Sequence, residues 1–474
     1  MGSAHGRPLR VALALLPLSW AVGCLTPTEV NQEMLPRVEA GDYRGALSIL
    51  EGASGAFGEK DSLLYHLERG MLYHYAGDFE PSNESFETAK RLAELHFTKS
   101  VTAEASTFLA NDNTRPYYGE NFERALLHVF GALNYQALGM IDEALVEVRQ
   151  LNFFLRQLIV NGEENAYRDD AFARYLAALF FEQDGDLDEA WVAYQKSLDA
   201  YATYEDLYGV RVPSLVRRDA RRVAGKLGRA TTQEFERRYG PEPFVPRPPG
   251  TGRVTVVHYN GRAPYKIDTF IDIAVRNGWP YVNKIDVDSE SKRDAARVSQ
   301  VATSVLADDV VRVAFPKYKT VKHRIRGLAV HAGGGEAARA ELVEDIGKIA
   351  QRDLADRIHR VRAKAIARAV LKYAMGKAAE YAAEEAGGDD YGKLAGALVR
   401  VGSNLARTAS EVSDKRGWFT VPDEIWLCQL DLPEGTHELR LSYRNKSGQE
   451  VRSDTVPVEI VPGEHRFVIS RTVE

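Results

Sequence analysis

Pairs of amphipathic segments, each joined by a short turn that contains glycine, recur along the first half of the chain. The clearest pair turns at Gly185-Asp186, with small and apolar residues at helical spacing on both sides, and equivalent turns lie at Gly41, Gly77 and Gly139. Apolar residues three to four positions apart predict amphipathic helices, and glycine permits the left-handed conformation in which many helices end. The pattern predicts stacked helix pairs of the tetratricopeptide (TPR) type over residues 24–238.

The spacing of the turn glycines exceeds the TPR period of about 34 residues at two places. Successive turn glycines lie 36, 62 and 46 residues apart, which indicates insertions at about residues 97–121 and 159–170. An insertion in a repeat array often takes part in binding, but it can also extend or cap a helix. Both interpretations stay open for these two segments.

A proline-rich stretch at residues 239–252 cannot continue a helix and is predicted to link two domains. Short runs with β-branched residues then predict strands in two groups, within residues 253–335 and 414–474. Such short, spaced strands favour a small β-sandwich of immunoglobulin-like size. The predicted strands are 253–259, 310–315, 323–330, 424–430, 437–443, 456–461 and 464–470.

Between the two strand groups, residues 336–413 are predicted to form a long inserted helical hairpin. Its first helix has an apolar stripe that includes Leu342, Ile358 and Tyr373, with basic residues largely on its other sides. The expected fold class is therefore multidomain α+β, with an N-terminal TPR-like α-solenoid followed by a β-sandwich that carries the hairpin. Such an arm could contact a partner, a second copy or a membrane, but its frequent charges argue against insertion into a bilayer.

The composition and the absence of known motifs argue against several classes of function. With 61 basic and 67 acidic residues the formal net charge is -6, which gives no electrostatic reason to expect a nucleic-acid partner. The sequence has no His-Glu-x-x-His motif, phosphate loop or nucleophile elbow, so it predicts neither an enzyme nor a cofactor or metal site. His66 and His74 lack a third ligand nearby, and the glycine-rich run at residues 331–336 is interpreted as a flexible joint.

The N-terminus has the features of a lipoprotein export signal. A basic start is followed by an apolar stretch over residues 11–22 that is too short to span a bilayer, and this ends in AVGC at Cys24, which resembles a lipobox. We expect residues 1–23 to be removed and Cys24 to be acylated, with each buried methylene contributing about 0.8 kcal/mol to membrane binding. Leu25 at the next position favours an outer-membrane anchor on the periplasmic side. The remaining cysteine, Cys428, is then expected to be a small buried residue.

A group of polar residues crosses the Gly139 repeat and the insertion before it. Either a buried hydrogen-bond network fixes the insertion against the repeat, or these residues line a groove that contacts a peptide or glycan. Asn134, in the middle of a helix, needs partners if it is buried. Arg174 and Glu182, on the first helix of the last clear repeat, are expected to face a partner across the repeat concavity. The polar group consists of Glu120, Glu123, Arg124, His128, Asn134, Arg149 and Asn152.

Several short segments, in their order along the chain, carry a resemblance that covers nearly the whole mature protein. They are residues 118–123, 132–135, 147–152, 171–175, 257–261, 342–346, 414–418 and 432–437. Together they resemble an uncharacterised family of bacterial TPR envelope lipoproteins, often encoded near activators of penicillin-binding proteins. The resemblance implies a lipid-anchored scaffold that binds a protein partner, linked to peptidoglycan synthesis or outer-membrane assembly, and it leaves the oligomeric state open. The alternative is a protein that binds peptidoglycan or carbohydrate through its sandwich.

Overall fold

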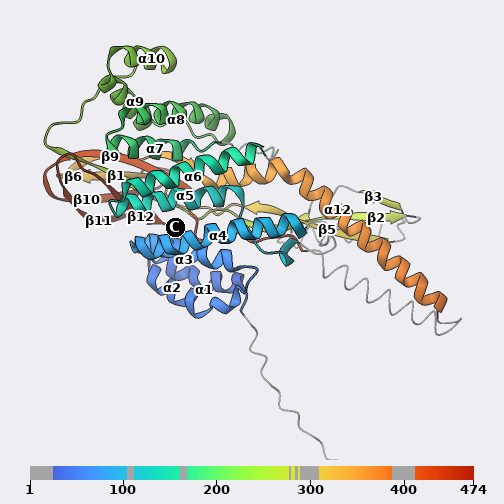
Figure 1. Ribbon diagram of the computed structural model, residues 1–474. Coiled ribbons are helices and arrows are strands. Elements are labelled where there is room, and N and C mark those ends of the chain that lie inside the picture. The colour runs from blue at the N-terminus through green and yellow to red at the C-terminus, as the bar shows by residue number, and fades with distance from the viewer. Residues whose placement is uncertain are drawn as a thin grey trace, which may run out of the picture.

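The computed structural model describes residues 25–103, 112–160, 167, 169–276, 279–282, 287–288, 309–386 and 412–473, so Cys24 and the signal segment lie outside the described residues. Helices in consecutive, packed pairs make up the N-terminal part (Figure 1), which confirms the predicted TPR-like helical region. The pairs are α1 (Pro27–Glu39) with α2 (Tyr43–Gly52), α3 (Ser62–Ala76) with α4 (Phe79–Ala103), α5 (Asn121–Ala137) with α6 (Ile141–Val160), α7 (Ala171–Asp184) with α8 (Leu187–Tyr208), and α9 (Ser214–Leu227) with α10 (Arg229–Tyr239).

The predicted turn glycines have the backbone conformation that the turns require. Their φ angles are 75° at Gly41, 79° at Gly77, 76° at Gly139 and 90° at Gly185. These angles lie in the left-handed region, where a residue without a Cβ is least strained, so the chain can reverse within a few residues. The first helix of each of these pairs therefore ends where the sequence pattern indicates.

The two predicted insertions extend helices in their described parts. Helix α4 continues to Ala103, and a short 3-10 helix, η2 (Asp112–Thr114), precedes α5. Helix α6 continues to Val160 before α7 begins at Ala171. Helix α4 has 25 residues and α6 has 20, whereas α8, which precedes no predicted insertion, has 22, so only α4 is longer than the other second helices of the described pairs.

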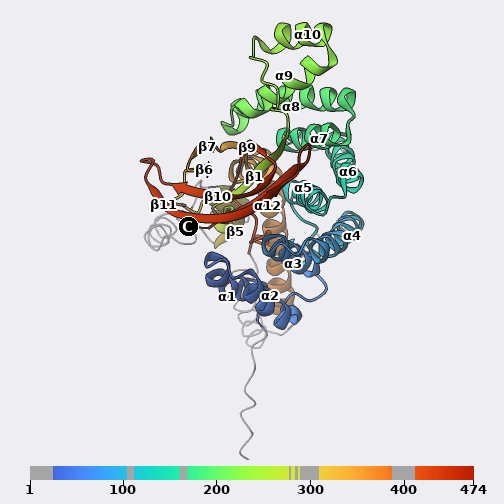
Figure 2. The ribbon, with the colours of Figure 1, turned by 90° about the vertical axis from the view of Figure 1, so that its left-hand side faces the viewer.

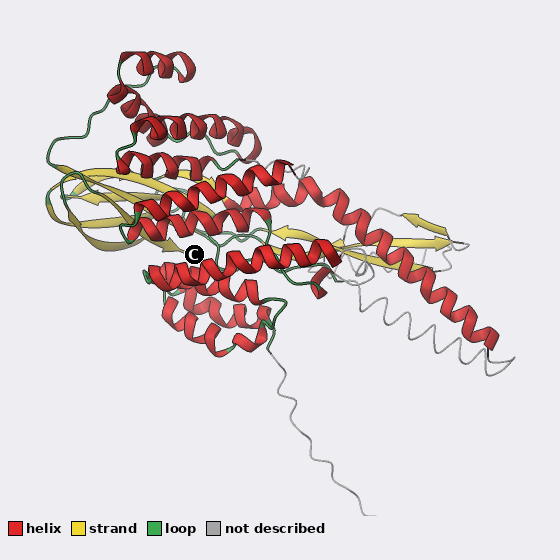
Figure 3. Cartoon of the chain, in the orientation of Figure 1, coloured by secondary structure: helices red, strands yellow, loops and turns green. Residues whose placement is uncertain are grey.

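Two four-stranded sheets follow the helices (Figure 3), in the orders β12-β1-β9-β8 and β11-β10-β6-β7. In the first sheet, β1 is parallel to β12 and antiparallel to β9. Side chains from both sheets, among them Val256, Cys428 and Leu441, share one hydrophobic core, so Cys428 is buried as expected. The strands are β1 (Thr251–Asn260), β6 (Gly327–Ala332), β7 (Gly335–Arg339), β8 (Glu341–Asp345), β9 (Glu424–Pro433), β10 (Gly435–Arg444), β11 (Glu450–Ile460) and β12 (His465–Thr472).

The inserted helix begins later than the sequence indicated. Residues 336–345, expected to be helical, lie in strands β7 and β8, and helix α12 (Ile346–Ala386) starts only afterwards. Leu342, which was assigned to the apolar stripe of the helix, instead pairs with Trp426 of β9. Pairing with an existing sheet edge outweighs the helical spacing, because local propensity is weaker than tertiary packing. The second helix of the expected hairpin, residues 391–413, falls outside the described residues except for its last two.

Helix α12 forms an arm together with a small third sheet. Its 41 residues span about 60 Å at about 1.5 Å per residue. One side of the helix, including Ala369, packs against strands β2 (Tyr265–Arg276) and β5 (Asp309–Lys319), which pair with each other, while β3 (Trp279–Val282) and β4 (Val287–Asp288) pair with β2. Strand β2 was not predicted. Figure 1 shows the arm extending away from the helix pairs and the sandwich.

The helix pairs and the sandwich share a core, because both faces of the first sheet are buried. Alternate residues of β1, such as Val257 and Tyr259, point away from the sandwich interior and join the hydrophobic cluster of the helices. In Figure 2, α3 and α5 lie nearer to the strands than α4 and α6 do. The proline-rich stretch therefore connects two parts of one packed unit rather than two separate cores. No helix in the described part of the chain is long and apolar enough to cross a membrane.

Candidate functional site

The face of the repeat array that was expected to hold a partner is covered by the chain itself. This inner face consists of the sides of α3, α5 and α7 that face the sheets, and those helices contact β12 and β8. Residues 412–423 also cross it, where the Trp418 ring packs edge-on against Phe86 and Phe130 at centroid distances of 5.8 and 5.7 Å. Phe180 of α7 meets Phe467 of β12. The expectation of an open concavity is therefore corrected, since apolar side chains of the sheet fill it.

Arg174 and Glu182 do not lie on an open groove. The Glu182 side chain is 4% exposed and is ion-paired with Arg222, which is 1% exposed and also bonds Asp219 at 2.9 Å. Burial alone would raise the pKa of Glu182, but the hydrogen bonds and charge of Arg222 outweigh it and lower that pKa to about 2. Arg174 is held by Asp169, with 2.8 Å between Nε and Oδ1. The sequence missed this cluster because the basic partners of Glu182 come from α9 and from Arg247 in the proline-rich stretch, outside its own repeat.

Asn134 is the centre of a buried hydrogen-bond network, as its position in mid-helix required. Its amide nitrogen donates to the Ser82 hydroxyl and to Asn83 Oδ1, both at 2.8 Å, and its Oδ1 lies 2.5 Å from His74 Nδ1. His74 Nε2 is 2.9 Å from the Tyr259 hydroxyl. Burial lowers the pKa of His74 to about 4, so the imidazole is neutral at pH 7. A proton on Nδ1 then donates to Asn134, while Nε2 accepts from Tyr259.

Glu120 and Glu123 are also buried and bind other parts of the chain. Glu120, at the start of α5, is ion-paired with Lys266 of β2 and Arg357 of α12. Burial alone would raise the pKa of Glu120, but the charges of Arg357 and Lys266 lower it to about 2. Glu123 accepts a hydrogen bond of 2.7 Å from the backbone N–H of Trp418. For these two residues and Asn134, the interpretation as a structural network is the one that the geometry supports.

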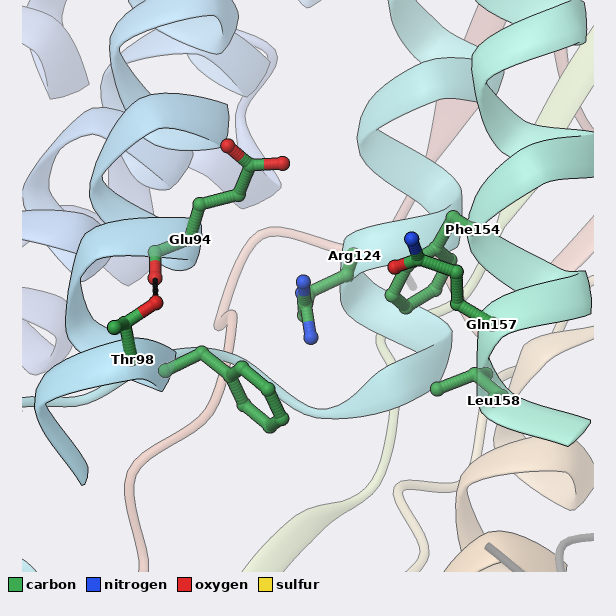
Figure 4. A pocket seen from close by; sticks show the side chains of 7 residues that line it. Glu94, Thr98, Arg124, Phe154, Gln157 and Leu158 are labelled. Atoms are coloured by element: carbon green, nitrogen blue, oxygen red, sulfur yellow. Dashed lines mark hydrogen bonds between the residues drawn. The ribbon is translucent and has the colours of Figure 1, made fainter. Parts of the chain in front are cut away.

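The other polar candidates on α5 and α6 lie on the opposite, outer side of the array. Arg124, His128 and Arg149 border a groove of about 520 Å³ between α4 and α6, with α5 beneath it. A smaller hollow of about 220 Å³ adjoins this groove, and Figure 4 shows Arg124 projecting from α5 into it, between α4 and α6. Asn152, also on α6, is half-buried. The outer groove is lined by Glu87, Lys90, Arg91, Ala93, Glu94, Arg124, Leu127, His128, Val146, Arg149, Gln150, Phe153, Phe154 and Gln157.

The base of the outer groove is fixed by charge pairs. Glu147 accepts from Lys90 Nζ at 2.5 Å and from His128 Nδ1 at 2.8 Å. Burial would raise the pKa of Glu147, but the hydrogen bond from His128 and the charge of Lys90 lower it. The guanidinium of Arg124 lies over the Phe154 ring, 4.5 Å from its centroid. These contacts bind α4, α5 and α6 together and give the groove a preformed shape.

The side of the outer groove that α6 forms carries apolar side chains that are exposed to solvent. Phe153 is 63% exposed and Val146 is 45% exposed, both on α6. Phe153 was not singled out from the sequence, although the sequence contained a signal for its exposure. Leu151 and Leu155 already supply the buried side of the helix, and Phe153, two positions from each, cannot point the same way. The groove can therefore hold an apolar side chain against Phe153 while charged groups line its rim.

No protein-family model and no curated protein matches the chain. Several solved structures are similar over part of it. BtubC (BKLC) from P. vanneervenii is 16% identical over 47% of this chain and 85% of its own, with a TM-score of 0.30. A Rap protein complexed with competence and sporulation factor is 14% identical over 45% of this chain and 52% of its own, with a TM-score of 0.27. PilW, a type IV pilus biogenesis factor, is 16% identical over 44% of this chain and 90% of its own, with a TM-score of 0.23. The TPR-like arrangement of this chain rests on its own helix pairs.

Proposed function

We propose that this protein is a scaffold that binds a protein partner in the cell envelope and is held at the periplasmic side of the outer membrane through acylated Cys24. The observation that carries the binding role is the outer groove, where Phe153 is 63% exposed beside a hollow of about 520 Å³. A large exposed aromatic next to a preformed hollow is typical of an interaction site. The inner face is instead covered by the sheet, whose apolar side chains pack into the hydrophobic cluster of the helices.

The chemistry of the outer groove favours a partner segment with an apolar side chain flanked by carboxylates. The apolar side chain would pack against Phe153 and Val146. At the rim, Arg91 and Arg149 are exposed on opposite helices, whereas Lys90 is already paired with Glu147. A hollow of this size holds a few side chains rather than a domain, so we expect the partner to insert a short segment.

The binding role is tested with a photoreactive amino acid at Gln150, which lines the outer groove. In intact cells this position should yield a defined crosslinked adduct, and Phe153→Ser should abolish it. The matched control is Val192→Ser, which replaces an exposed apolar residue on α8, outside the groove, and should leave the adduct unchanged. An adduct that persists in Phe153→Ser, or crosslinks found only from the arm or the sandwich, would refute the groove as the binding site.

The anchoring role rests on the lipobox-like sequence before Cys24. Cys24→Ser should move the protein from the membrane fraction to the soluble fraction, because acyl chains supply the membrane affinity. Mass spectrometry of the wild-type N-terminus should detect a diacylglycerol-modified cysteine. Unchanged fractionation of the variant, together with an unmodified wild-type cysteine, would contradict this part of the proposal.

The alternative of glycan binding through the sandwich receives less support. Glycan-binding faces present exposed aromatic rings, whereas the tyrosine, tryptophan and phenylalanine side chains in the described sandwich strands are buried or half-buried. A link to peptidoglycan synthesis or outer-membrane assembly would come through the bound protein. Identification of the Gln150 adduct tests that link directly.

A further inference from the structure

Three potential metal ligands meet where the sandwich joins the arm. Glu424 begins β9 and pairs with Asn260 at the end of β1, while His323 precedes β6. The backbone N–H of Gly347, in the first turn of α12, donates to the Asp423 carbonyl at 3.1 Å. One ligand atom from each of His323, Asp423 and Glu424 lies within 4.8 Å of the other two. Segments far apart in sequence thus bring an imidazole and two carboxylates together.

The imidazole of His323 is buried and is directed at Asp423. The His323 side chain is 2% exposed, and its Nδ1 has no hydrogen-bond partner in the described part of the chain. This Nδ1 lies 3.5 Å from Asp423 Oδ2. Such a separation is long for a hydrogen bond, but it is close to the roughly 3.4 Å between two ligands of a tetrahedral ion with bonds of about 2.0–2.1 Å.

The surroundings hold the ligand groups in place. Gly261 has a φ of 66°, and a Cβ at this position would lie 2.4 Å from His323 Nδ1, so only glycine leaves room for the imidazole. Glu424 Oε2 accepts hydrogen bonds of 2.9 Å from Asn260 Nδ2 and Trp426 Nε1. Oε2 is thereby fixed by the surrounding chain, which leaves Oε1 for a further ligand. Outer-shell bonds of this kind orient the carboxylates of metal sites.

A cationic side chain occupies the open edge of this cluster. Arg326 Nη1 lies 2.9 Å from His323 Nε2 and 3.7 Å from Glu424 Oε1. The Arg326 side chain is 43% exposed, so it can turn outward into solvent. Its departure would leave the carboxyl groups of Asp423 and Glu424 beside the imidazole without a balancing cation, and a divalent ion would supply that positive charge. His323 Nε2–H could then donate to Glu424 Oε2, which lies 3.4 Å away.

We propose that His323, Asp423 and Glu424 form a binding site for a divalent transition-metal ion of the zinc class, and that the ion replaces Arg326 as the positive charge beside Glu424. Imidazole and carboxylate ligands suit zinc, and three protein ligands leave a fourth position for water. The ion would fasten the start of α12 to the sandwich, because Asp423 is hydrogen-bonded to the first turn of that helix. Its role would be to fix the base of the arm.

The test is a titration of the purified full chain, after chelator treatment, with Zn²⁺ alone. One saturable equivalent should bind to the wild type, and His323→Ala and Asp423→Asn should each weaken binding at least tenfold. His437→Ala, which replaces another histidine of the sandwich, is the control and should bind as the wild type does. Circular dichroism shows whether each variant is folded.

A second variant separates a metal site from a simple ion-pair network. Arg326→Ala removes the competing cation, so it should tighten Zn²⁺ binding several-fold and raise the thermal midpoint when Zn²⁺ is added. A network without a metal role would show no zinc binding in Arg326→Ala and a lower midpoint with or without Zn²⁺. The proposal is overturned by that result, or by binding that survives both His323→Ala and Asp423→Asn.

Discussion

The packing of α3 against α4 gives a quantitative prediction for Gly70→Ala. A Cβ on Gly70 would lie 2.4 Å from Phe86 Cε1 and 2.5 Å from Cδ1, about 1 Å closer than the 3.4 Å at which ordinary contact begins. Phe86 is 1% exposed and lies between Phe130 and Trp418, so its ring has no free space to enter. The two helices would have to separate, which would also stretch the 2.7 Å hydrogen bond from the Ser82 hydroxyl to the Gly70 carbonyl.

The expected cost follows from opposing contributions. Alanine in place of glycine in a helix interior normally stabilises by about 1 kcal/mol. Overpacking a close-packed core costs about 1–3 kcal/mol, and a weakened buried hydrogen bond costs about 1 kcal/mol more. Overpacking and the hydrogen bond outweigh the gain in helix propensity, so Gly70→Ala should destabilise the protein by about 1–3 kcal/mol.

Gly131→Ala is the matched control, because Gly131 lies in the first helix of the next pair. The nearest atom to its added Cβ is Glu147 Cδ at 3.5 Å, which is an ordinary contact. Thermal and urea unfolding should therefore rank Gly70→Ala below the wild type and Gly131→Ala at or above it. A Gly70→Ala variant as stable as Gly131→Ala would refute the reasoning, since the close approach at Gly70 would then carry no cost.

Further predictions concern buried charges, pH and the shared core. Glu182→Gln should destabilise the protein by about 2–3 kcal/mol in urea unfolding, because it removes one of the two carboxylates that pair with the buried Arg222 and leaves only Asp219. Arg174→Gln, at a more accessible pair, should cost under about 1 kcal/mol. Burial lowers the pKa of His74 to about 4 in the folded protein, below the value of about 6.5 in the unfolded chain. As the pH drops from about 6.5 to 4, the unfolded chain takes up a proton that the folded protein does not, so the free energy of unfolding falls. Between pH 7 and pH 5, the free energy of unfolding measured in urea should therefore fall by roughly 2 kcal/mol less in His74→Gln than in the wild type. Residues 25–240 expressed alone should aggregate in size-exclusion chromatography, because the sheet that covers their apolar inner face is missing; a monomeric, cooperatively unfolding fragment would contradict the shared core.

Local features of the sequence determined the helix pairs, their turns and most strands. The glycines at 41, 77, 139 and 185 indicate chain reversals without knowledge of the tertiary structure, because glycine, which has no Cβ, adopts the left-handed conformation with little strain. Alternation in residues 424–430 likewise indicated β9, since period two places side chains on opposite faces of a strand. Asn134 could be expected to need partners, although the sequence did not say which residues would provide them.

Tertiary structure decided which faces meet. The spacing that predicts an amphipathic helix does not say what covers its apolar side, so the sequence could not show that β1 and β9 fill the inner face of the repeats. Glu182 had the same local pattern as a surface residue, and only the approach of α9 buried it with Arg222. The outer groove depends on the angle between α4 and α6, and the cluster at His323 joins segments a hundred residues apart. Periodicity is encoded along the chain, whereas these contacts depend on how distant surfaces pack.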